Sequence, residues 1–273
     1  MSIPAELLFI LDDAPLPAPH RALGAGSVAP GLVAVGPPPT LARLEQAYAQ
    51  ATFPCYGARE LPLWWCPDPR MVLDVQALRV TRSLRQRLRA TRVMQSGEYP
   101  PASGWAISAS RCFDAVMAAC ASTPRRGQKG DSGVWILPEL RRSYGQWHRL
   151  GRAHSVEVWC DGVLAGGLYG VNLGAVFFGE SMFSWRSDAS KIALAALVAW
   201  CQRIGIPMID CQMHSAHLES LGARQVPLDT LLRALPPAAV CEHPDHPAHV
   251  WRPDAVWPAD LLDGLAHPAT PLT

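Results

Sequence analysis

The sequence lacks a hydrophobic run long enough to cross a membrane, and it has almost no lysine. Its longest uninterrupted apolar run is residues 192–201, whereas a transmembrane helix needs about 20 apolar residues. The first residues include Glu6 and no basic segment, so we expect no secretory signal. Of the 24 basic residues, only Lys129 and Lys191 are lysines, and the others are arginines. We therefore expect a cytoplasmic protein that does not bind membranes.

Patterns typical of disulfide frameworks and zinc modules are missing as well. The 8 cysteines include no C-x-x-C pair, and their spacing matches no zinc module. Without a secretory signal, they are most simply reduced thiols. Cys241, His243, His246 and His249 suggest a metal site near the C-terminus as the alternative. The prolines between them favour an irregular tail, and we predict no metal and no other cofactor.

Repeats and the common catalytic signatures are also absent. No segment matches a phosphate-binding loop, a dinucleotide-binding glycine motif, a zinc-peptidase motif or a nucleophile elbow. The 273 residues are 49% hydrophobic and 17% charged, with a formal net charge of +1. This composition excludes a disordered or low-complexity chain. A chain of this length can bury a large core and can form two domains.

The N-terminal part of the chain is rich in proline and tryptophan. Residues 1–40 predict a mostly irregular lead-in, because prolines interrupt any long element. Thr40 is a suitable cap for a short helix over residues 41–50. The segment 63–70, with its adjacent tryptophans and two prolines, cannot be helical.

The second half of the chain predicts an α/β fold. Alternating apolar residues on both sides of the Asp161–Gly162 turn predict an antiparallel pair of strands, with a third strand at 175–179. A helix that is apolar on all sides follows at 188–205, and a further strand follows at 207–212. A meander followed by a helix and a strand predicts a mixed sheet.

Four arginines share one face of a predicted helix over residues 82–92. They are Arg82, Arg85, Arg89 and Arg92. Spacings of three and four residues place them in one stripe. No acidic residue in this stretch neutralises the stripe, so its like charges repel unless they meet an anion. We predict contacts with a nucleic-acid backbone, and a merely solvated basic face is the alternative.

Three polar side chains lie where predicted strands end. Asp210 and Gln212 alternate along one strand, which places them on the same face, roughly 6.5–7 Å apart at Cα. Glu180 follows directly after the third strand of the meander and is placed to open onto the same cleft. We expect these groups to act on one reacting atom. The alternative is a structural role, in which they satisfy neighbouring backbone groups.

Blocks of sequence between about residues 41 and 235 resemble one bacterial enzyme family. The blocks are LWWCPDPR at 63–70, VWI at 134–136, AHSVEVW at 153–159, GGLYGV at 166–171, FGESMFS at 178–184, DASK at 188–191, IDCQ at 209–212 and SLGA at 220–223. In these blocks the chain resembles the leucyl/phenylalanyl-tRNA–protein transferases, which move Leu or Phe from aminoacyl-tRNA to a protein N-terminus.

The resemblance implies an architecture and a set of site residues. The implied fold is α/β (α+β), with a small N-terminal domain at 1–68 and a GNAT acyltransferase-like catalytic domain at 69–273 that has a mixed sheet and an irregular C-terminal tail. Asp210 and Gln212 match the pair to which the family's peptide-bond chemistry is attributed, and Glu180 matches a glutamate that meets the reacting groups.

The same resemblance implies how the donor is bound. Trp135 matches a tryptophan beside the terminal adenosine of the donor, and the arginine stripe matches a basic cluster that contacts the tRNA acceptor stem. A further set of positions resembles the lining of the hydrophobic pocket for the transferred side chain. These positions are Leu168, Phe177, Leu194, Leu197, Cys201 and Ile209.

The function implied is transfer of Leu, Phe or Met from aminoacyl-tRNA to proteins that begin with Lys or Arg, which marks them for N-degron proteolysis. An aminoacyl ester is already activated, so ATP is not required. The implied partners are charged tRNA and acceptor proteins, and we expect a monomer.

Two departures from the family pattern motivate alternatives. Cys55 and Trp185 stand where the family usually has Trp and Arg, so a non-catalytic tRNA-binding relative, or one with altered specificity, is one alternative. An acyl-CoA-dependent acetyltransferase is the other. It would need a glycine-rich turn before the helix to bind pyrophosphate, and residues 184–188 contain no glycine.

Overall fold

Two β-sheets organise the described part of the chain. The computed structural model describes residues 9–11, 14–57, 60–123, 136–236, 251 and 257–267. Within these ranges, the smaller sheet has the order β1 (Leu32–Val35), β3 (Leu63–Trp65) and β2 (Phe53–Pro54). A short helix, α1 (Leu41–Tyr48), runs between β1 and β2, and the Thr40 side chain accepts a hydrogen bond from its first turn. The predicted cap at Thr40 is confirmed.

The larger sheet carries the rest of the strands described. Its order is β11 (Arg224–Val226), β4 (Arg70–Asp74), β10 (Met208–Gln212), β9 (Val176–Ser184), β8 (Val163–Leu173), β7 (Ala153–Cys160), β6 (Trp105–Ala109) and β5 (Thr91–Val93). Strands β9 and β10 pair in parallel, as do β5 and β6, and the other neighbours are antiparallel. The predicted α/β class with a mixed sheet is confirmed.

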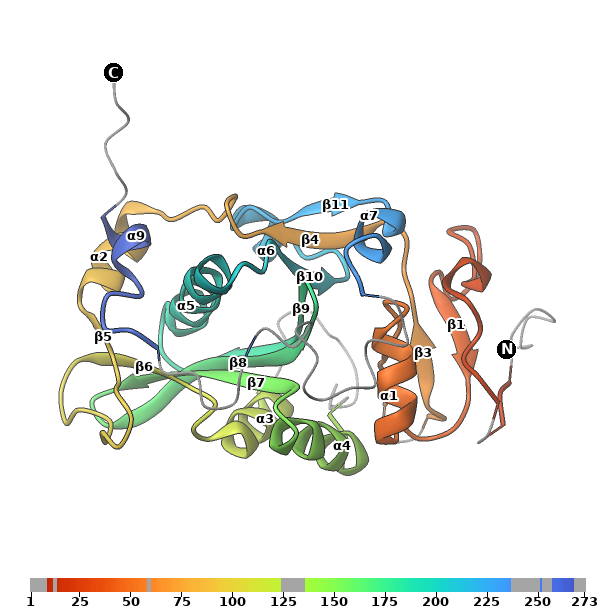
Figure 1. Ribbon diagram of the computed structural model, residues 1–273, viewed down its shortest axis with the longest axis horizontal. Coiled ribbons are helices and arrows are strands. Elements are labelled where there is room, and N and C mark those ends of the chain that lie inside the picture. The colour runs from red at the N-terminus through yellow and green to blue at the C-terminus, as the bar shows by residue number, and fades with distance from the viewer. Residues whose placement is uncertain are drawn as a thin grey trace, which may run out of the picture.

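Helices cover both faces of this sheet (Figure 1). The long helix α5 (Ala189–Ile204) packs on one face, and α3 (Phe113–Ser122) and α4 (Pro138–Arg149) pack on the other. Residues 192–201 of α5 are all buried, as a helix that is apolar on all sides requires. Its end at Gly205, where φ is 79°, matches the predicted stop. Two short helices, α6 (Ala216–Ser220) and α7 (Leu228–Leu232), flank β11.

The lead-in that we predict as irregular contains regular elements. They are a 3-10 turn, η1 (Pro19–Arg21), and the buried strand β1. The run of four apolar residues in β1 is too short to identify from the sequence, because its hydrogen-bonding partner β3 lies some thirty residues later in the chain. The described residues of this segment are otherwise irregular, as predicted, and the strand was missed because pairing, and not local pattern, makes it.

The predicted arginine helix is shorter than its sequence pattern suggests. Helix α2 (Arg82–Arg89) begins at the expected cap, Thr81, and buries Leu84 and Leu88. It ends before Arg92, which lies on β5 because this stretch pairs in parallel with β6. The prediction of four arginines on one helix was therefore wrong for Arg92.

The described part of the C-terminal tail packs against the core. It includes the short helix α9 (Asp263–Ala266), which lies beside α2 in Figure 1. Trp251 and Trp257 are buried with Trp200 of α5 in one aromatic cluster. The expected irregular tail thus contributes large apolar side chains to the core. Within the described ranges, no helix combines the length and apolar character needed to cross a bilayer.

Candidate active site

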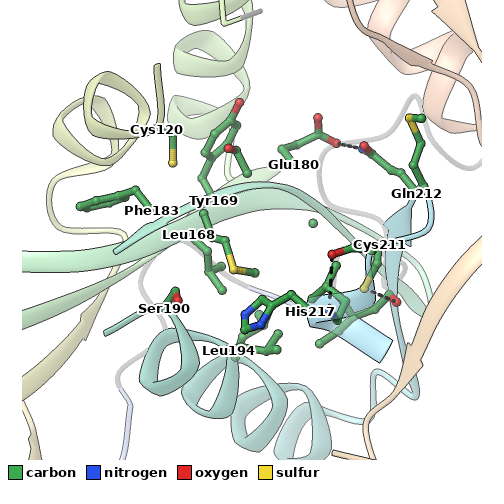
Figure 2. A pocket seen from close by; sticks show the side chains of 18 of the residues that line it. Cys120, Leu168, Tyr169, Glu180, Phe183, Ser190, Leu194, Cys211, Gln212 and His217 are labelled. Carbon is green, nitrogen blue, oxygen red and sulfur yellow. Dashed lines mark hydrogen bonds between the residues drawn. The ribbon is translucent and has the colours of Figure 1, made fainter. Parts of the chain in front are cut away.

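A cavity opens where two parallel strands separate. Strands β9 and β10 pair from Met208↔Val176 to Asp210↔Phe178, and beyond this point each strand continues without pairing to the other. A cavity of about 540 Å³ lies at this divergence, lined by the later residues of both strands. Figure 2 shows Glu180 and Gln212 on one side of the sheet, with Leu168 and Leu194 on the other. The cavity therefore joins a polar end to an apolar end.

A β-bulge presents Glu180 to the cavity. In the pairing of β8 with β9, Tyr169 lies opposite Ser181 and Gly170 lies opposite Gly179, so Glu180 is the extra residue between two pairs. A bulge re-aims the side chain it carries, and bulges recur beside active sites. The carboxyl group of Glu180 is thereby turned toward α1 and α4.

A second irregularity lies on β10. Asp210 pairs with Val72 and Gln212 pairs with Met71, so Cys211 is the extra residue, and Gln212 has a left-handed backbone with φ of 63°. The regular alternation that we predict for Asp210 and Gln212 is therefore wrong. The backbone N–H of Gln212 instead donates to Oδ1 of Asp210 at 2.8 Å, so the two residues meet through a tight turn of the chain.

Substitution of Gly170 tests the first bulge. A Cβ atom at Gly170 would lie 2.1 Å from the carbonyl oxygen of Phe178 and 2.5 Å from the ring of Phe177, so the bulged strand would have to move. We expect Gly170→Ala to lower the free energy of unfolding by about 1–3 kcal/mol in urea titrations. Gly264→Ala is the matched control, because its Cβ meets no atom within 4 Å, and a helical alanine should be neutral or slightly stabilising. Equal stability of both variants would contradict this prediction.

Glu180 accepts hydrogen bonds from three side chains. The Tyr48 hydroxyl donates to Oε1 at 2.5 Å, the Tyr144 hydroxyl donates to Oε2 at 3.2 Å, and Nε2 of Gln212 donates to Oε1 at 3.0 Å. Tyr48 comes from α1 and Tyr144 from α4, so two helices and two strands converge on one carboxyl group. Sequence reasoning missed both tyrosines, since neither lies near Glu180 in the chain.

The pKa of the Glu180 carboxyl group lies close to neutral pH. Burial raises the pKa of its carboxyl group to about 7, the Asp210 charge adds to this rise, and the hydrogen bonds from Tyr48 and Tyr144 and the Arg70 charge oppose it. A carboxyl group with such a pKa can gain or lose a proton near neutral pH. This is the behaviour expected of a group that handles a proton in a reaction.

Asp210 lies beneath the cavity and does not line it. Its carboxylate and the Arg70 guanidinium are both fully buried and form two parallel hydrogen bonds, Nε to Oδ1 at 2.9 Å and Nη2 to Oδ2 at 2.7 Å. The Arg70 guanidinium also lies over the Phe53 ring, 4.9 Å from its centroid. Arg70 belongs to the sequence block at 63–70, but nothing in the local pattern indicated its partner.

The apolar end of the cavity contains most of the expected pocket residues. Leu168, Leu194, Leu197 and Ile209 line it. Phe177 and Cys201 do not line it and are fully buried in the core behind it. Further side chains of the lining that sequence reasoning missed are Phe53, Cys120, Met182, Cys211 and His217. Trp135 lies outside the described residues.

The four predicted tRNA-contacting arginines lie on the side of the molecule that holds α2 (Figure 1), and none of them lines the cavity. Arg82 is exposed. Arg85 and Arg89 donate to the carbonyl oxygens of Val80 and Ala266, and Arg92 pairs with Glu98 at 3.3 Å. These contacts leave most of the face charged and accessible, although Arg92 does have an acidic neighbour.

Metal ligands do not cluster in the part of the chain that the structure covers. Among the described residues, no group of three or more His, Cys, Asp or Glu side chains could hold an ion. Cys241, His243, His246 and His249 lie outside the described residues.

Comparisons with known proteins identify relatives along most of the chain. A family model described as "Leucyl/phenylalanyl-tRNA protein transferase" matches residues 72–236, and the model of that family's N-terminal domain matches residues 39–68. A protein of Methylibium petroleiphilum named leucyl/phenylalanyl-tRNA–protein transferase is 53% identical over 78% of this chain and 77% of its own length. Relatives with the same name from Leptothrix cholodnii and Albidiferax ferrireducens are 49% and 44% identical, over 79% and 86% of this chain and 80% and 88% of theirs.

Similarity to a solved structure is weaker. The structure described as "The structure of L-PGS from Bacillus licheniformis" is similar with a TM-score of 0.33 and 11% sequence identity, over 67% of this chain and 54% of that chain.

Proposed function

The chain belongs to the leucyl/phenylalanyl-tRNA protein transferase family, a family of aminoacyltransferases, and we propose that it transfers Leu or Phe from aminoacyl-tRNA to the N-terminal α-amine of acceptor proteins. The observation that carries the proposal is the cavity at the divergence of β9 and β10, where Glu180 and Gln212 meet beside an apolar pocket. The catalytic residues proposed are Glu180 and Gln212, and Asp210 supports Gln212 from beneath the cavity.

The chemistry requires a neutral amine at an activated carbonyl. The acceptor's ammonium group loses one proton to the Glu180 carboxylate, and its nitrogen attacks the ester carbonyl of the donor. A new C–N bond forms, the ester C–O bond breaks, and the departing ribose oxygen of the tRNA takes the second proton of the amine and becomes a hydroxyl. Glu180 then releases its proton to solvent. The ester supplies the driving force, so the proposal includes no cofactor.

Gln212 is placed to orient the amine. Its Nε2 is held by Glu180, so its amide oxygen is the atom proposed to accept a hydrogen bond from the attacking nitrogen. Asp210 supports this arrangement through the Gln212 backbone N–H and not through the side-chain amide. Correct placement of two reacting groups can supply several kcal/mol of the barrier reduction.

The cavity lining supports the proposed substrates. Four aliphatic side chains at the apolar end, those of Leu168, Leu194, Leu197 and Ile209, suit a Leu, Phe or Met side chain. A polar donor side chain would leave a buried group unpaired there, at a cost of about 1–3 kcal/mol. Glu180 is the acidic residue among the described lining residues, and its charge favours acceptors that begin with Lys or Arg.

The remaining features of the proposal concern partners and setting. We propose that Arg82, Arg85 and Arg89 of α2, together with Arg92 of β5, contact the tRNA acceptor stem, and that Trp135 belongs to the donor site. Phe177 and Cys201 lie in the core behind the pocket and do not line it. A monomer acting in the cytoplasm, on proteins destined for N-degron proteolysis, completes the proposal. The proposed boundary between the two domains, at residues 68 and 69, lies in the segment between β3 and β4.

A transfer assay tests the proposed function. Labelled Leu or Phe on tRNA is incubated with the protein and with peptides that differ only in the first residue. We expect label on peptides that begin with Lys or Arg, and less on peptides that begin with Gly. Absence of transfer to every peptide, with tRNA still bound, would favour a non-catalytic relative and overturn the proposal.

The pH dependence of transfer is a second prediction. Because Glu180 acts in its ionised form and burial raises its pKa to about 7, the single-turnover rate should rise as pH increases through about 7 and then level off. The control reaction without peptide corrects for ester hydrolysis. A rate that is flat across neutral pH would contradict a proton-accepting role for Glu180.

A further inference from the structure

Arg70 is fully buried and, like its partner Asp210, does not line the cavity. Burying two charges costs several kcal/mol for each ion, and well-packed apolar side chains in place of such a pair are often as stable or more stable. Stability alone is therefore a weak reason for this pair. Its contacts with the site suggest another role.

A short chain of contacts joins Arg70 to Glu180. The fork of the guanidinium holds both oxygens of Asp210, which sets the plane of that carboxylate. Oδ1 of Asp210 then accepts the backbone N–H of Gln212 at 2.8 Å, directly at the residue with a φ of 63°. Nε2 of Gln212 in turn donates to Oε1 of Glu180 at 3.0 Å.

The left-handed backbone at Gln212 makes this support necessary. A non-glycine residue with positive φ costs of order 1–3 kcal/mol and persists where surrounding contacts hold it. In β10 the Asp210 carboxylate provides such a contact, and both of its oxygens accept hydrogen bonds from Arg70. The other neighbour of Arg70 is the Phe53 ring, which itself lines the cavity.

We propose that Arg70 is a positioning residue for the transfer reaction: its two-point hold on Asp210 fixes the turn that aims the Gln212 amide at Glu180 and at the acceptor amine. The proposal rests on the proposed function for its catalytic consequence, and on the contacts above for its structural part.

Electrostatics at Glu180 agree with this role. The groups facing the Glu180 carboxyl are Tyr48 of α1, Tyr144 of α4, Asp210 of β10 and Arg70 of β4. The Asp210 charge raises the pKa of Glu180 and the Arg70 charge lowers it. A lysine at position 70 would keep the charge but lose the fork, because an ammonium is a point charge that cannot match both carboxylate oxygens. A lysine variant can therefore separate the effect of the Arg70 charge from the effect of its two hydrogen bonds to Asp210.

The experiment compares three variants with the wild type. Arg70→Lys keeps the charge, and Arg70→Met with Asp210→Leu removes the pair without leaving a lone buried charge. Arg43→Met is the matched control, because Arg43 is also a buried arginine, and its side chain donates to the Ala14 carbonyl and to Gln46, none of which lines the cavity. Stability is measured by urea unfolding, and kcat and KM are measured for donor and acceptor across neutral pH.

A signal independent of activity is the side-chain amide resonance of Gln212 in a nitrogen–proton NMR spectrum, assigned by its loss in Gln212→Met. In Arg70→Lys we expect this resonance to move, kcat to fall about 100-fold, KM to change little, and the pH at which the rate rises to stay near its wild-type value. The folded double variant should lose kcat similarly, and Arg43→Met should keep both kcat and the resonance.

Either of two results would overturn the proposal: a Gln212 resonance that stays in place in Arg70→Lys, or a kcat within threefold of the wild type in the folded double variant. If the wild type itself transfers no amino acid, the proposed function fails, and the NMR comparison alone decides whether Arg70 positions Gln212.

Discussion

Replacing Glu180 with glutamine is expected to slow aminoacyl transfer by about 10²- to 10⁴-fold, the range that proton transfer by a positioned side chain contributes. Glutamine keeps the size of the side chain but cannot take a proton from the acceptor's ammonium group. It also brings its own amide donors to a site where Tyr48, Tyr144 and Gln212 already donate. The measurement is single-turnover transfer of labelled Leu at a pH above 7, with donor binding measured separately.

Glu139→Gln is the matched control for this variant. Glu139 lies on α4, accepts a hydrogen bond from Tyr56 and does not line the cavity. The same chemical change there should leave the transfer rate within about threefold of the wild type. The increase in rate with pH should also disappear in Glu180→Gln and remain in Glu139→Gln. A Glu180→Gln enzyme with nearly normal turnover would remove Glu180 from the mechanism.

The largest effect on stability is expected from Asp210→Leu. This change leaves the Arg70 guanidinium fully buried without its carboxylate, and breaking a buried ion pair in this way costs about 3–5 kcal/mol. Arg70 already has one buried nitrogen, Nη1, without a hydrogen-bond partner among the described residues. The Phe53 ring alone is a poor substitute for two strong hydrogen bonds. Urea unfolding of purified protein measures the loss.

Asp210→Leu is compared with two other variants. Asp260→Leu removes an exposed carboxylate, 3.9 Å from Arg203, and should cost less than about 1 kcal/mol because water screens such pairs. Adding Arg70→Met to Asp210→Leu should restore most of the lost stability, since the unpaired charge is then gone. If Asp210→Leu were as stable as Asp260→Leu, the buried pair could not hold the turn at Gln212.

Local sequence was sufficient for the elements whose signals lie within one segment. The caps at Thr40 and Thr81, the buried helix that ends at Gly205, and the hairpin at Asp161–Gly162 are all present. Each depends on contacts between residues that are close in the chain or on a conformation that one residue type favours. The mixed sheet followed from the order of these elements.

Long-range pairing decided what local sequence could not. Strand β1 forms because β3 pairs with it, and Arg92 leaves the arginine helix because β5 pairs with β6. The strand was missed and the position of Arg92 was predicted wrongly for the same reason. The sequence of a short apolar or charged segment does not indicate which strand it pairs with.

The features of the site also fall into those that the sequence predicted and those that only the structure showed. The sequence by itself singled out Glu180, Asp210 and Gln212, and its ordered blocks identified the family. The expected position at strand ends was wrong for Glu180 and Asp210, which lie within β9 and β10. Only the tertiary structure decided how these residues meet, because two bulges replace the regular alternation of the strands. It also decided which residues support them: Tyr48 lies 132 residues from Glu180, and Arg70 lies 140 residues from Asp210. Such contacts depend on strand register and on the packing of α1 and β4, and neither can be predicted from the spacing of residues along the chain.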